Sequence, residues 1–179
     1  PTVLPVAGWD NLTTKGLIYI QPDLFLAWNN AHREEAMKWH KVPAEIIKVI
    51  GAPIFDDWFA YKKPSLSKAE FCKKYGLREA DPIFLYLGSS SNMAENEVWL
   101  VDRLHAALKN SQNPNLRRAQ FLVRPHPANH LNYQQIKNDD IKVAPKGTLP
   151  KSHETMQLFY DSIYHAAAAI GINSSSMLM

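Results

Sequence analysis

The stretch Phe121-Leu122-Val123-Arg124-Pro125-His126-Pro127 decides how the chain is interpreted, because an apolar run leads directly into a cation, a histidine and two prolines. The apolar half is typical of a buried parallel strand, and α/β proteins place their ligands in the loops that follow such strands. The prolines stiffen the backbone around His126 and remove two amide donors. Arg124 brings a permanent charge and a fork of donors suited to phosphate or carboxylate. Two interpretations stay open here: a ligand site, or a proline-rich turn whose histidine caps the strand.

Strand and helix patterns alternate from residue 64 onward. Strands are expected at 83–87, 120–123, 141–144 and 167–172, and helices at 94–109, 133–136 and 154–165. A further helix is expected between Ser67 and Gly76, since Ser67 and Glu70 have capping-box spacing and Gly76 suits a helix end. This alternation implies right-handed crossovers and an open parallel sheet with helices on both faces, a Rossmann-like arrangement.

The first 60 residues are less regular. They contain expected strands at 24–28 and 46–50 and an amphipathic helix at 30–40. We therefore expect residues 1–63 to be the end of one α/β lobe with its connection, and residues 64–179 to be most of a second lobe. The chain starts at Pro1 and ends just after a serine-rich helix start, so we expect a fragment of a longer protein.

Composition excludes several classes of protein. The net charge is +3 with scattered basic residues, which is a poor match to the coherent basic face of a nucleic-acid-binding protein. The single cysteine, Cys72, rules out an internal disulfide and suits a reducing cytoplasm. No apolar run approaches the roughly 18 residues of a membrane span. The histidines lack metal-site spacing, and dinucleotide, Walker and nucleophile-elbow motifs are absent, so no metal or cofactor is expected.

Three loops that follow predicted strands are rich in anion-binding groups. Gly88-Ser89-Ser90-Ser91 combines a glycine, which lets backbone approach a ligand, with hydroxyls and amides that suit phosphate. Arg124 to Pro127 is the second loop. The third contains Asn173, Ser174 and Ser175, where the amides at a helix start would favour phosphate. Helix capping explains any one loop, but their shared position at the carboxyl edge of one sheet favours a ligand.

The segment from Gly8 to Gly16 is the matching candidate in the first lobe. It contains Asp10, a candidate general base if Trp9 buries its carboxylate, and the cation Lys15. The alternative is an Asx turn, in which Asp10 or Asn11 bonds nearby backbone, and for this loop alone that alternative is favoured.

Taken in order, these motifs resemble a family. Gly-Ser-Ser-Ser, Val-Arg-Pro-His-Pro, Phe-Tyr-Asp-Ser-Ile-Tyr-His and Gly-Ile-Asn-Ser-Ser follow one another as in two-lobed bacterial glycosyltransferases of the GT-B type. The chain is most similar to the branch that contains CDP-glycerol glycerophosphotransferases and capsule polysaccharide transferases. The resemblance implies a GT-B-like α/β fold with two Rossmann-like lobes and parallel sheets, represented here by the end of the N-terminal lobe and most of the C-terminal lobe.

The resemblance also implies roles for individual residues. His126 and Arg124 match a basic-x-His-Pro element and would stabilise the phosphates of a nucleotide-activated donor or its leaving group; Ser89 and Ser90 lie in the neighbouring loop. Ser174 and Ser175, preceded by Asn173, match the closing Ser-Ser and would hold the same phosphates. Asp10 could serve as base, but the branch has His-Gly-Thr where this chain has Trp9-Asp10-Asn11, so transfer of a sugar and transfer of glycerol phosphate both stay open.

The expected function is therefore transfer from a nucleotide-linked donor to a hydroxyl acceptor in the synthesis of a surface polysaccharide or cell-wall polymer. A nucleotide-sugar 2-epimerase of the same fold and a non-catalytic nucleotide-binding module are the alternatives. The expected partners are the donor and the acceptor, without nucleic acid. The expected location is the cytoplasm, and peripheral association with the inner face of the membrane is compatible with that function.

Overall fold

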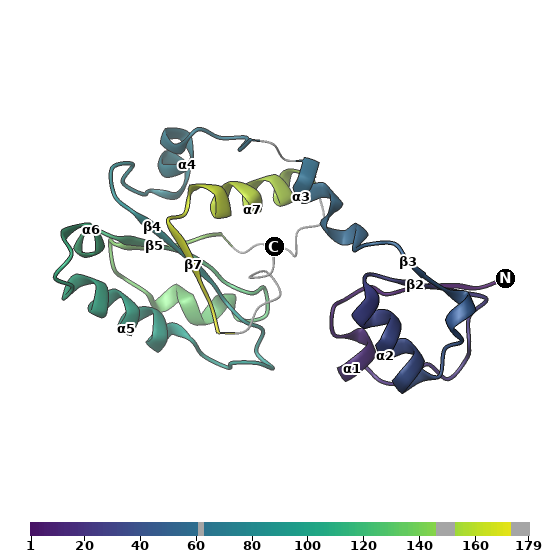
Figure 1. Cartoon of the computed structure of the whole chain (residues 1–179). Helices are drawn as coiled ribbons and strands as arrows, with labels where there is room; N and C mark the ends of the chain where they lie inside the picture. The colour runs from purple at the N-terminus through teal and green to yellow at the C-terminus, as the bar shows by residue number, and fades with distance from the viewer. Residues whose placement is uncertain (61–62, 146–152, 173–179) are drawn as a thin grey trace. The chain divides into compact units, whose positions relative to one another are not determined.

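The computed structural model describes residues 1–60, 63–145 and 153–172. The chain divides into two compact units, Pro1–Ala60 and Tyr61–Met179. Each unit is built on its own parallel sheet with helices packed against it (Figure 1). The α/β class and the parallel pairing expected from the sequence are both confirmed.

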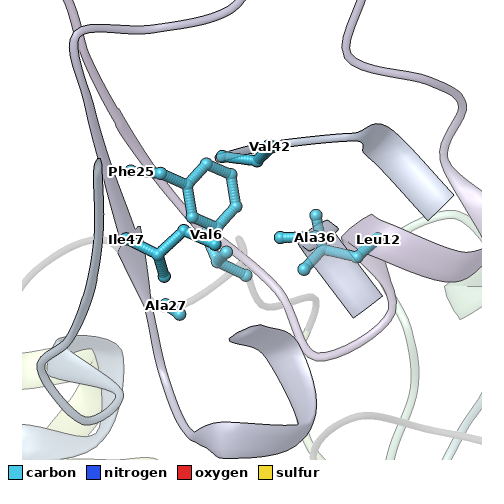
Figure 2. Packing of buried hydrophobic residues seen from close by; sticks show 7 residues of the cluster. All are labelled: Val6, Leu12, Phe25, Ala27, Ala36, Val42 and Ile47. Carbon is cyan, nitrogen blue, oxygen red and sulfur yellow. The ribbon is translucent and has the colours of Figure 1, made fainter. Parts of the chain in front are cut away.

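The first unit has a three-stranded sheet in the order β1-β2-β3. Its strands are β1 (Val3–Pro5), β2 (Leu24–Ala27) and β3 (Ile47–Val49). Its helical segments are α1 (Asn11–Thr14), α2 (Asn30–His40), η1 (Ala44–Ile46), η2 (Pro53–Phe55) and α3 (Asp56–Ala60). Figure 2 shows the core between the sheet and helices α1 and α2, made of Val6, Leu12, Phe25, Ala27, Ala36, Val42 and Ile47.

The second unit has a four-stranded parallel sheet in the order β6-β5-β4-β7. Its strands are β4 (Ile83–Leu87), β5 (Gln120–Arg124), β6 (Ile141–Val143) and β7 (Ala168–Ile170). Its helices are α4 (Lys68–Tyr75), α5 (Val98–Lys109), α6 (Pro114–Arg117), η3 (His130–Gln135) and α7 (His153–His165). In Figure 1, α4 and α7 lie on one side of this sheet and α5 and α6 on the other.

The strand order of the second unit creates a topological switch point. The chain starts at β4, moves outward through β5 to β6, and then returns to place β7 on the other side of β4. In open α/β sheets of this kind, ligands bind outside the carboxyl ends of the strands where the order reverses. The loop that follows β4 lies at this reversal, and the loop that follows β5 lies beside it.

The expected elements of the second unit are present, but several bounds differ. The helix expected at 133–136 is the 3-10 helix η3 at His130–Gln135, and the strand expected at 167–172 is shorter, at Ala168–Ile170. The Ser67 and Glu70 capping box is present in both directions, and Gly76 ends α4 with a positive φ of 67°. Hydrogen bonds from Ser67 lower the pKa of Glu70. Helix α5 begins at Val98 rather than at residue 94, because the Asn96 side chain accepts the Val98 amide (3.0 Å).

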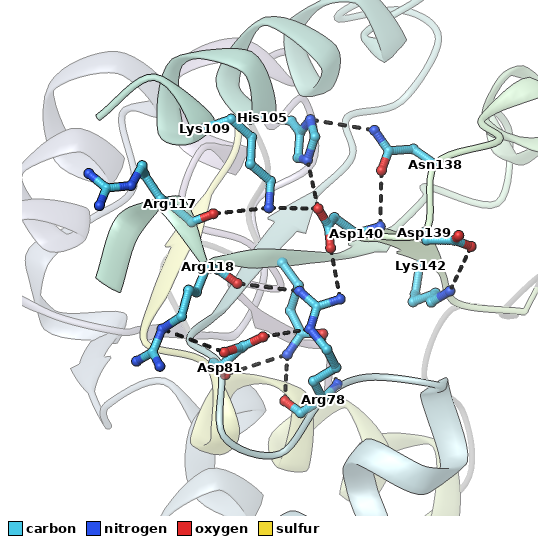
Figure 3. A network of polar contacts seen from close by, with 11 residues as sticks. Arg78, Asp81, His105, Lys109, Arg117, Arg118, Asn138, Asp139, Asp140 and Lys142 are labelled. Atoms are coloured by element: carbon cyan, nitrogen blue, oxygen red, sulfur yellow. Dashed lines mark hydrogen bonds and ion pairs between the residues drawn. The ribbon is translucent and has the colours of Figure 1, made fainter. Parts of the chain in front are cut away.

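Charged side chains join the amino ends of the strands in the second unit (Figure 3). Asp140, which precedes β6, pairs with Arg78 (2.7 Å) and with Lys109 of α5 (2.6 Å). Arg78 also pairs with Asp81, which precedes β4. These contacts lower the pKa of Asp140 to about 2, with the Lys109 hydrogen bond as the largest cause. This amino-edge network lies at the end of the sheet opposite the candidate ligand loops, so we assign it to stability.

Candidate functional site

The loops after β4 and β5 are packed backbone to backbone at the carboxyl edge of the second sheet. Leu87 is in register with Arg124, and the Gly88 amide donates to the Arg124 carbonyl (3.0 Å). A Cβ atom on Gly88 would lie 3.2 Å from both Pro125 Cα and the His126 nitrogen, and 3.0 Å from the Tyr133 hydroxyl oxygen. Glycine suits position 88 because any side chain there would have to push the neighbouring loop or the Tyr133 hydroxyl aside by a few tenths of an ångström.

His126 is half-buried on a stiff loop between its two prolines. Its Nδ1 accepts the Ala128 amide (3.2 Å), and its carbonyl accepts the Asn129 amide (2.9 Å). Because Nδ1 acts as an acceptor in this geometry, the neutral ring carries its proton on Nε2. Nε2 is then the ring atom that can donate a hydrogen bond to an anion.

Arg124 is a fixed cation rather than a mobile surface side chain. Its Nη1 donates to the Ser162 hydroxyl (2.8 Å) and to the Tyr75 hydroxyl (3.4 Å), and the guanidinium lies 5.4 Å from the centre of the Phe159 ring. Ser162 is fully buried on α7. A charge held in this way needs no reorganisation when an anion binds, which is the property that electrostatic stabilisation requires.

Ser89 and Ser90 are placed differently from the simple phosphate loop that the sequence suggested. Ser89 is buried, and its amide donates to Glu97 Oε2 (2.8 Å). A phosphate would have to displace this carboxylate to reach that amide. Ser90 is half-buried, and its carbonyl accepts the Met93 and Ala94 amides (both 3.0 Å), which closes the turn after β4.

Glu97 is the residue that sequence reasoning missed. Its side chain is 1% exposed, and Oε2 accepts from the Tyr133 hydroxyl (2.9 Å) as well as from the Ser89 amide. Burial first, and the Glu97 carboxylate second, raise the pKa of Tyr86 and of Tyr133 above the ordinary tyrosine value. The only sequence signal was that a glutamate follows Asn96 just before an apolar helix, and such a residue is usually a solvated helix start.

The candidate base Asp10 lies in the first unit, immediately before α1. It pairs with Lys15 (3.4 Å) and accepts from the Thr14 hydroxyl (3.2 Å), and the neighbouring Trp9 is 52% exposed. Asn11 Oδ1 accepts the amides of Ala7 (3.0 Å) and Gly8 (2.7 Å). These bonds order the loop from residues before Asn11 and are not the Asx turn that the sequence offered as the alternative. The role of Asp10 as a base stays a prediction.

Two buried histidines of α2 hold this first-unit loop. The neutral ring of His40 donates from Nε2 to the Leu12 carbonyl (2.8 Å), since its Nδ1 accepts the Ile18 amide (3.1 Å). His32 Nε2 lies 3.1 Å from the Trp9 carbonyl oxygen. The segment that carries Asp10 is thus ordered by side-chain contacts with the helix behind it.

The remaining predicted residues, Asn173, Ser174 and Ser175, lie outside the described residues. Within the described ranges, no group of three or more histidine, cysteine, aspartate or glutamate side chains could hold a metal ion. No helix in the same ranges is long and apolar enough to cross a membrane.

One hollow adjoins the candidate edge. Its volume is about 310 Å³, and its wall includes Tyr133 and His130 together with residues 143–145 at the carboxyl end of β6. Ligand sites usually occupy about 300–1,000 Å³, so this hollow is large enough for part of a small molecule. A larger hollow of about 550 Å³ lies between Trp99 of α5 and the end of η3, and no predicted site residue lines it.

Comparisons with known proteins show which solved structures share the architecture of this chain. No protein-family model matches the chain, and no curated protein matches it. Among solved structures, a variant of the wall teichoic acid polymerase TagF is similar with a TM-score of 0.50 at 16% identity, over 87% of this chain and 36% of that chain. A UDP-N-acetylglucosamine 2-epimerase from Rickettsia bellii has a TM-score of 0.48 at 15% identity, over 84% of this chain and 37% of that chain.

The chain therefore spans little more than a third of the length of these structures. At this identity, the similarity to the polymerase concerns architecture alone. Both units of the chain contribute parallel α/β sheets to it, and the fold expected from the sequence is confirmed. The chain has a GT-B-like α/β fold.

Proposed function

We propose that the protein containing this chain transfers a sugar or glycerol phosphate group from a nucleotide-activated donor to a hydroxyl acceptor. The observation that carries the proposal is the position of two loops in the second unit. The Gly88 turn lies at the topological switch point, and the His126 loop is packed directly against it. This is the part of an open α/β sheet where ligands bind.

The chemistry of the edge suits a phosphorylated leaving group. When the bond to the transferred group breaks, negative charge accumulates on the departing nucleotide. In the proposed arrangement, His126 Nε2 donates to a phosphate oxygen, while the fixed guanidinium of Arg124 contributes positive charge from the β5 end. Preorganised donors of this kind lower the barrier because they are already oriented toward the developing charge.

The acceptor hydroxyl must lose a proton during transfer, and Asp10 is the proposed base. Asn173, Ser174 and Ser175 are proposed to contact the same donor phosphates from the segment after β7. The expected product class is a surface polysaccharide or cell-wall polymer, made in the cytoplasm at the inner face of the membrane. The wall teichoic acid polymerase with the similar fold supports this class, and no cofactor is part of the proposal.

A donor screen on the full-length protein tests the proposal. Melting temperature is measured with CDP-glycerol, UDP-N-acetylglucosamine, UDP-glucose and GDP-mannose, since a ligand that binds only the folded state raises it. At least one donor is expected to stabilise the protein, and its nucleotide should be released faster when an acceptor polyol or glycan is added. Turnover of UDP-N-acetylglucosamine without acceptor would indicate the epimerase, and saturable binding without any turnover would indicate a binding module.

The role of His126 is tested with His126→Ala, with His105→Ala as its control. His105 lies in the amino-edge network, 3.5 Å from Asp140, at the other end of the sheet. Loss of a donor aimed at the leaving group typically costs about 10²–10³ in kcat. We expect that loss for His126→Ala alone, and equal turnover of the two variants in the folded protein would overturn the assignment.

A further inference from the structure

We propose that Glu97 is a positioning residue of the donor edge. Its buried carboxylate holds the Gly88–Ser89 turn and the segment after β5 in one fixed arrangement. This inference rests on the proposed function, and it adds a residue that neither the sequence motifs nor the comparisons assign. Glu97 acts through other residues, because a side chain that is 1% exposed does not reach a ligand.

The carboxylate joins two segments that are far apart in the sequence. One oxygen, Oε2, receives both the Ser89 amide from the β4 loop (2.8 Å) and the Tyr133 hydroxyl from η3 (2.9 Å). The other oxygen, Oε1, is buried and has no hydrogen-bond partner among the residues that the structure describes. The buried Tyr86 hydroxyl, at the end of β4, lies near the same carboxylate, which adds to the effect of burial in raising the pKa of Tyr86.

Asn129 holds the same turn from its other side. Its Nδ2 donates to the Ser89 carbonyl (3.0 Å) and to the Ala94 carbonyl (2.8 Å), and it is itself 5% exposed. Both polar groups of the Ser89 backbone are therefore bonded by buried side chains, the amide by Glu97 and the carbonyl by Asn129. The turn at the switch point is set by these contacts rather than by solvent.

The cost of burying the Glu97 carboxylate indicates that this side chain does more than fill space in the core. A buried carboxylate is expensive unless it is paired, and no lysine, arginine or histidine in the described ranges forms an ion pair with Glu97. Apolar groups of similar shape can replace both partners of a buried hydrogen bond with little loss of stability, so stability alone does not require a carboxylate here. Its place directly before α5 offsets part of the cost, since the start of a helix favours negative charge.

The position of Glu97 also has a consequence for the donor. The Ser89 amide already donates its hydrogen bond to the Glu97 carboxylate, which also adds negative charge behind the turn. Phosphate oxygens are therefore disfavoured at Ser89. The anionic part of the donor is directed toward His126 and Arg124, and an uncharged hydroxyl-bearing part is left beside the Gly88 turn. The carboxylate thus sets the orientation of the donor as well as the shape of the loop.

The test compares Glu97→Ala and Glu97→Gln with Asp140→Asn in the full-length protein. Asp140→Asn weakens the amino-edge network and serves as a control for lost stability away from the donor edge. Calorimetric Kd values are measured well below each melting temperature, with whichever of CDP-glycerol, UDP-N-acetylglucosamine, UDP-glucose and GDP-mannose stabilises wild type. Glu97→Ala should weaken binding of the recognised donor at least about tenfold, the effect of losing one hydrogen bond to a charged group.

Glu97→Gln should recover part of this loss, because the amide oxygen of glutamine can still accept the Ser89 amide. Asp140→Asn should keep the wild-type Kd. Hydrogen exchange supplies a readout without ligand: the Ser89 amide should exchange faster in Glu97→Ala than in wild type or Asp140→Asn. If Glu97→Ala does not fold, Tyr133→Phe replaces it, since it removes one of the two bonds to Oε2 and leaves the ring in place.

The outcomes separate the two proposals. If wild type binds none of the four donors of the screen, the proposed function fails, and the positioning role fails with it. If wild type binds a donor and the Glu97 variants bind it equally well, only the positioning role is overturned. An unchanged exchange rate of the Ser89 amide in Glu97→Ala would also overturn it.

Discussion

Replacing Asp140 by asparagine should destabilise the second unit in a way that depends strongly on pH. The carboxylate pairs with Arg78 (2.7 Å) and Lys109 (2.6 Å) and lies 3.5 Å from His105 Nε2. The contacts with Lys109 first, and with Arg78, lower its pKa from 3.8 to about 2. A shift of this size corresponds to about 2.5 kcal/mol of stability at neutral pH. Because the side chain is 23% exposed, solvent screens part of that energy, and we expect about 1–2 kcal/mol.

The sign of the pH dependence follows from the lowered pKa of Asp140. Above its unfolded value of 3.8, the carboxylate is charged in both states, and the folded protein has the full benefit of the ion pairs. As the pH falls from about 4 to 2, the unfolded chain takes up the proton first, so the stabilisation is lost across this window. The difference between wild type and Asp140→Asn should therefore be largest near pH 7 and nearly absent at pH 2.

Urea unfolding of both proteins at several pH values between 2 and 7 measures this difference. Asp139→Asn is the matched control, since the neighbouring carboxylate is fully exposed and lies 3.9 Å from Lys142. It should change stability by less than about 0.5 kcal/mol. Equal unfolding midpoints for wild type and Asp140→Asn at pH 7, or a difference that persists unchanged to pH 2, would refute this account of the network.

Two further predictions concern close packing and a buried carboxylate. Gly88→Ala should lower the free energy of unfolding by about 1–3 kcal/mol, because the new methyl group would lie 3.0 Å from the Tyr133 hydroxyl and 3.2 Å from backbone atoms. Thermal unfolding measures this, and wild-type stability would show that the loops separate freely. Asp161→Asn should cost about 1–3 kcal/mol, because fully buried Asp161 accepts both the amide (2.8 Å) and the hydroxyl (2.6 Å) of Ser65. Ser65→Ala should cost less in the same urea assay, and the reverse order would contradict the assignment of the buried carboxylate as the costly partner.

Local sequence signals predicted most elements of the second unit. Continuous apolar runs identified β4 and β5, and the capping residues Ser67 and Gly76 bounded α4 correctly. These features can be predicted from the sequence because they depend only on neighbouring residues. Strand β1 was not predicted, since it is a three-residue edge strand that ends in Pro5 and is recognisable only through its pairing with β2.

For the candidate site, the sequence indicated which loops to consider but not how their atoms are used. The sequence correctly placed the histidine between two prolines in a loop directly after a strand. In contrast, the occupation of the Ser89 amide by Glu97 depends on a contact between residues eight positions apart, across a turn. The contacts of Arg124 with Ser162 and Tyr75 join segments separated by 38 and 49 residues, and no local pattern reports them.

The sequence by itself determined the α/β class, the alternation of strands and helices, and the loops rich in anion-binding groups, because each follows from local periodicity and composition. Only the tertiary structure decided the strand order β6-β5-β4-β7, which places the Gly88 turn at the switch point. It alone also showed that a glutamate beside that turn is buried. Strand order and burial depend on which distant segments exclude water together, and that is a property of the packed chain.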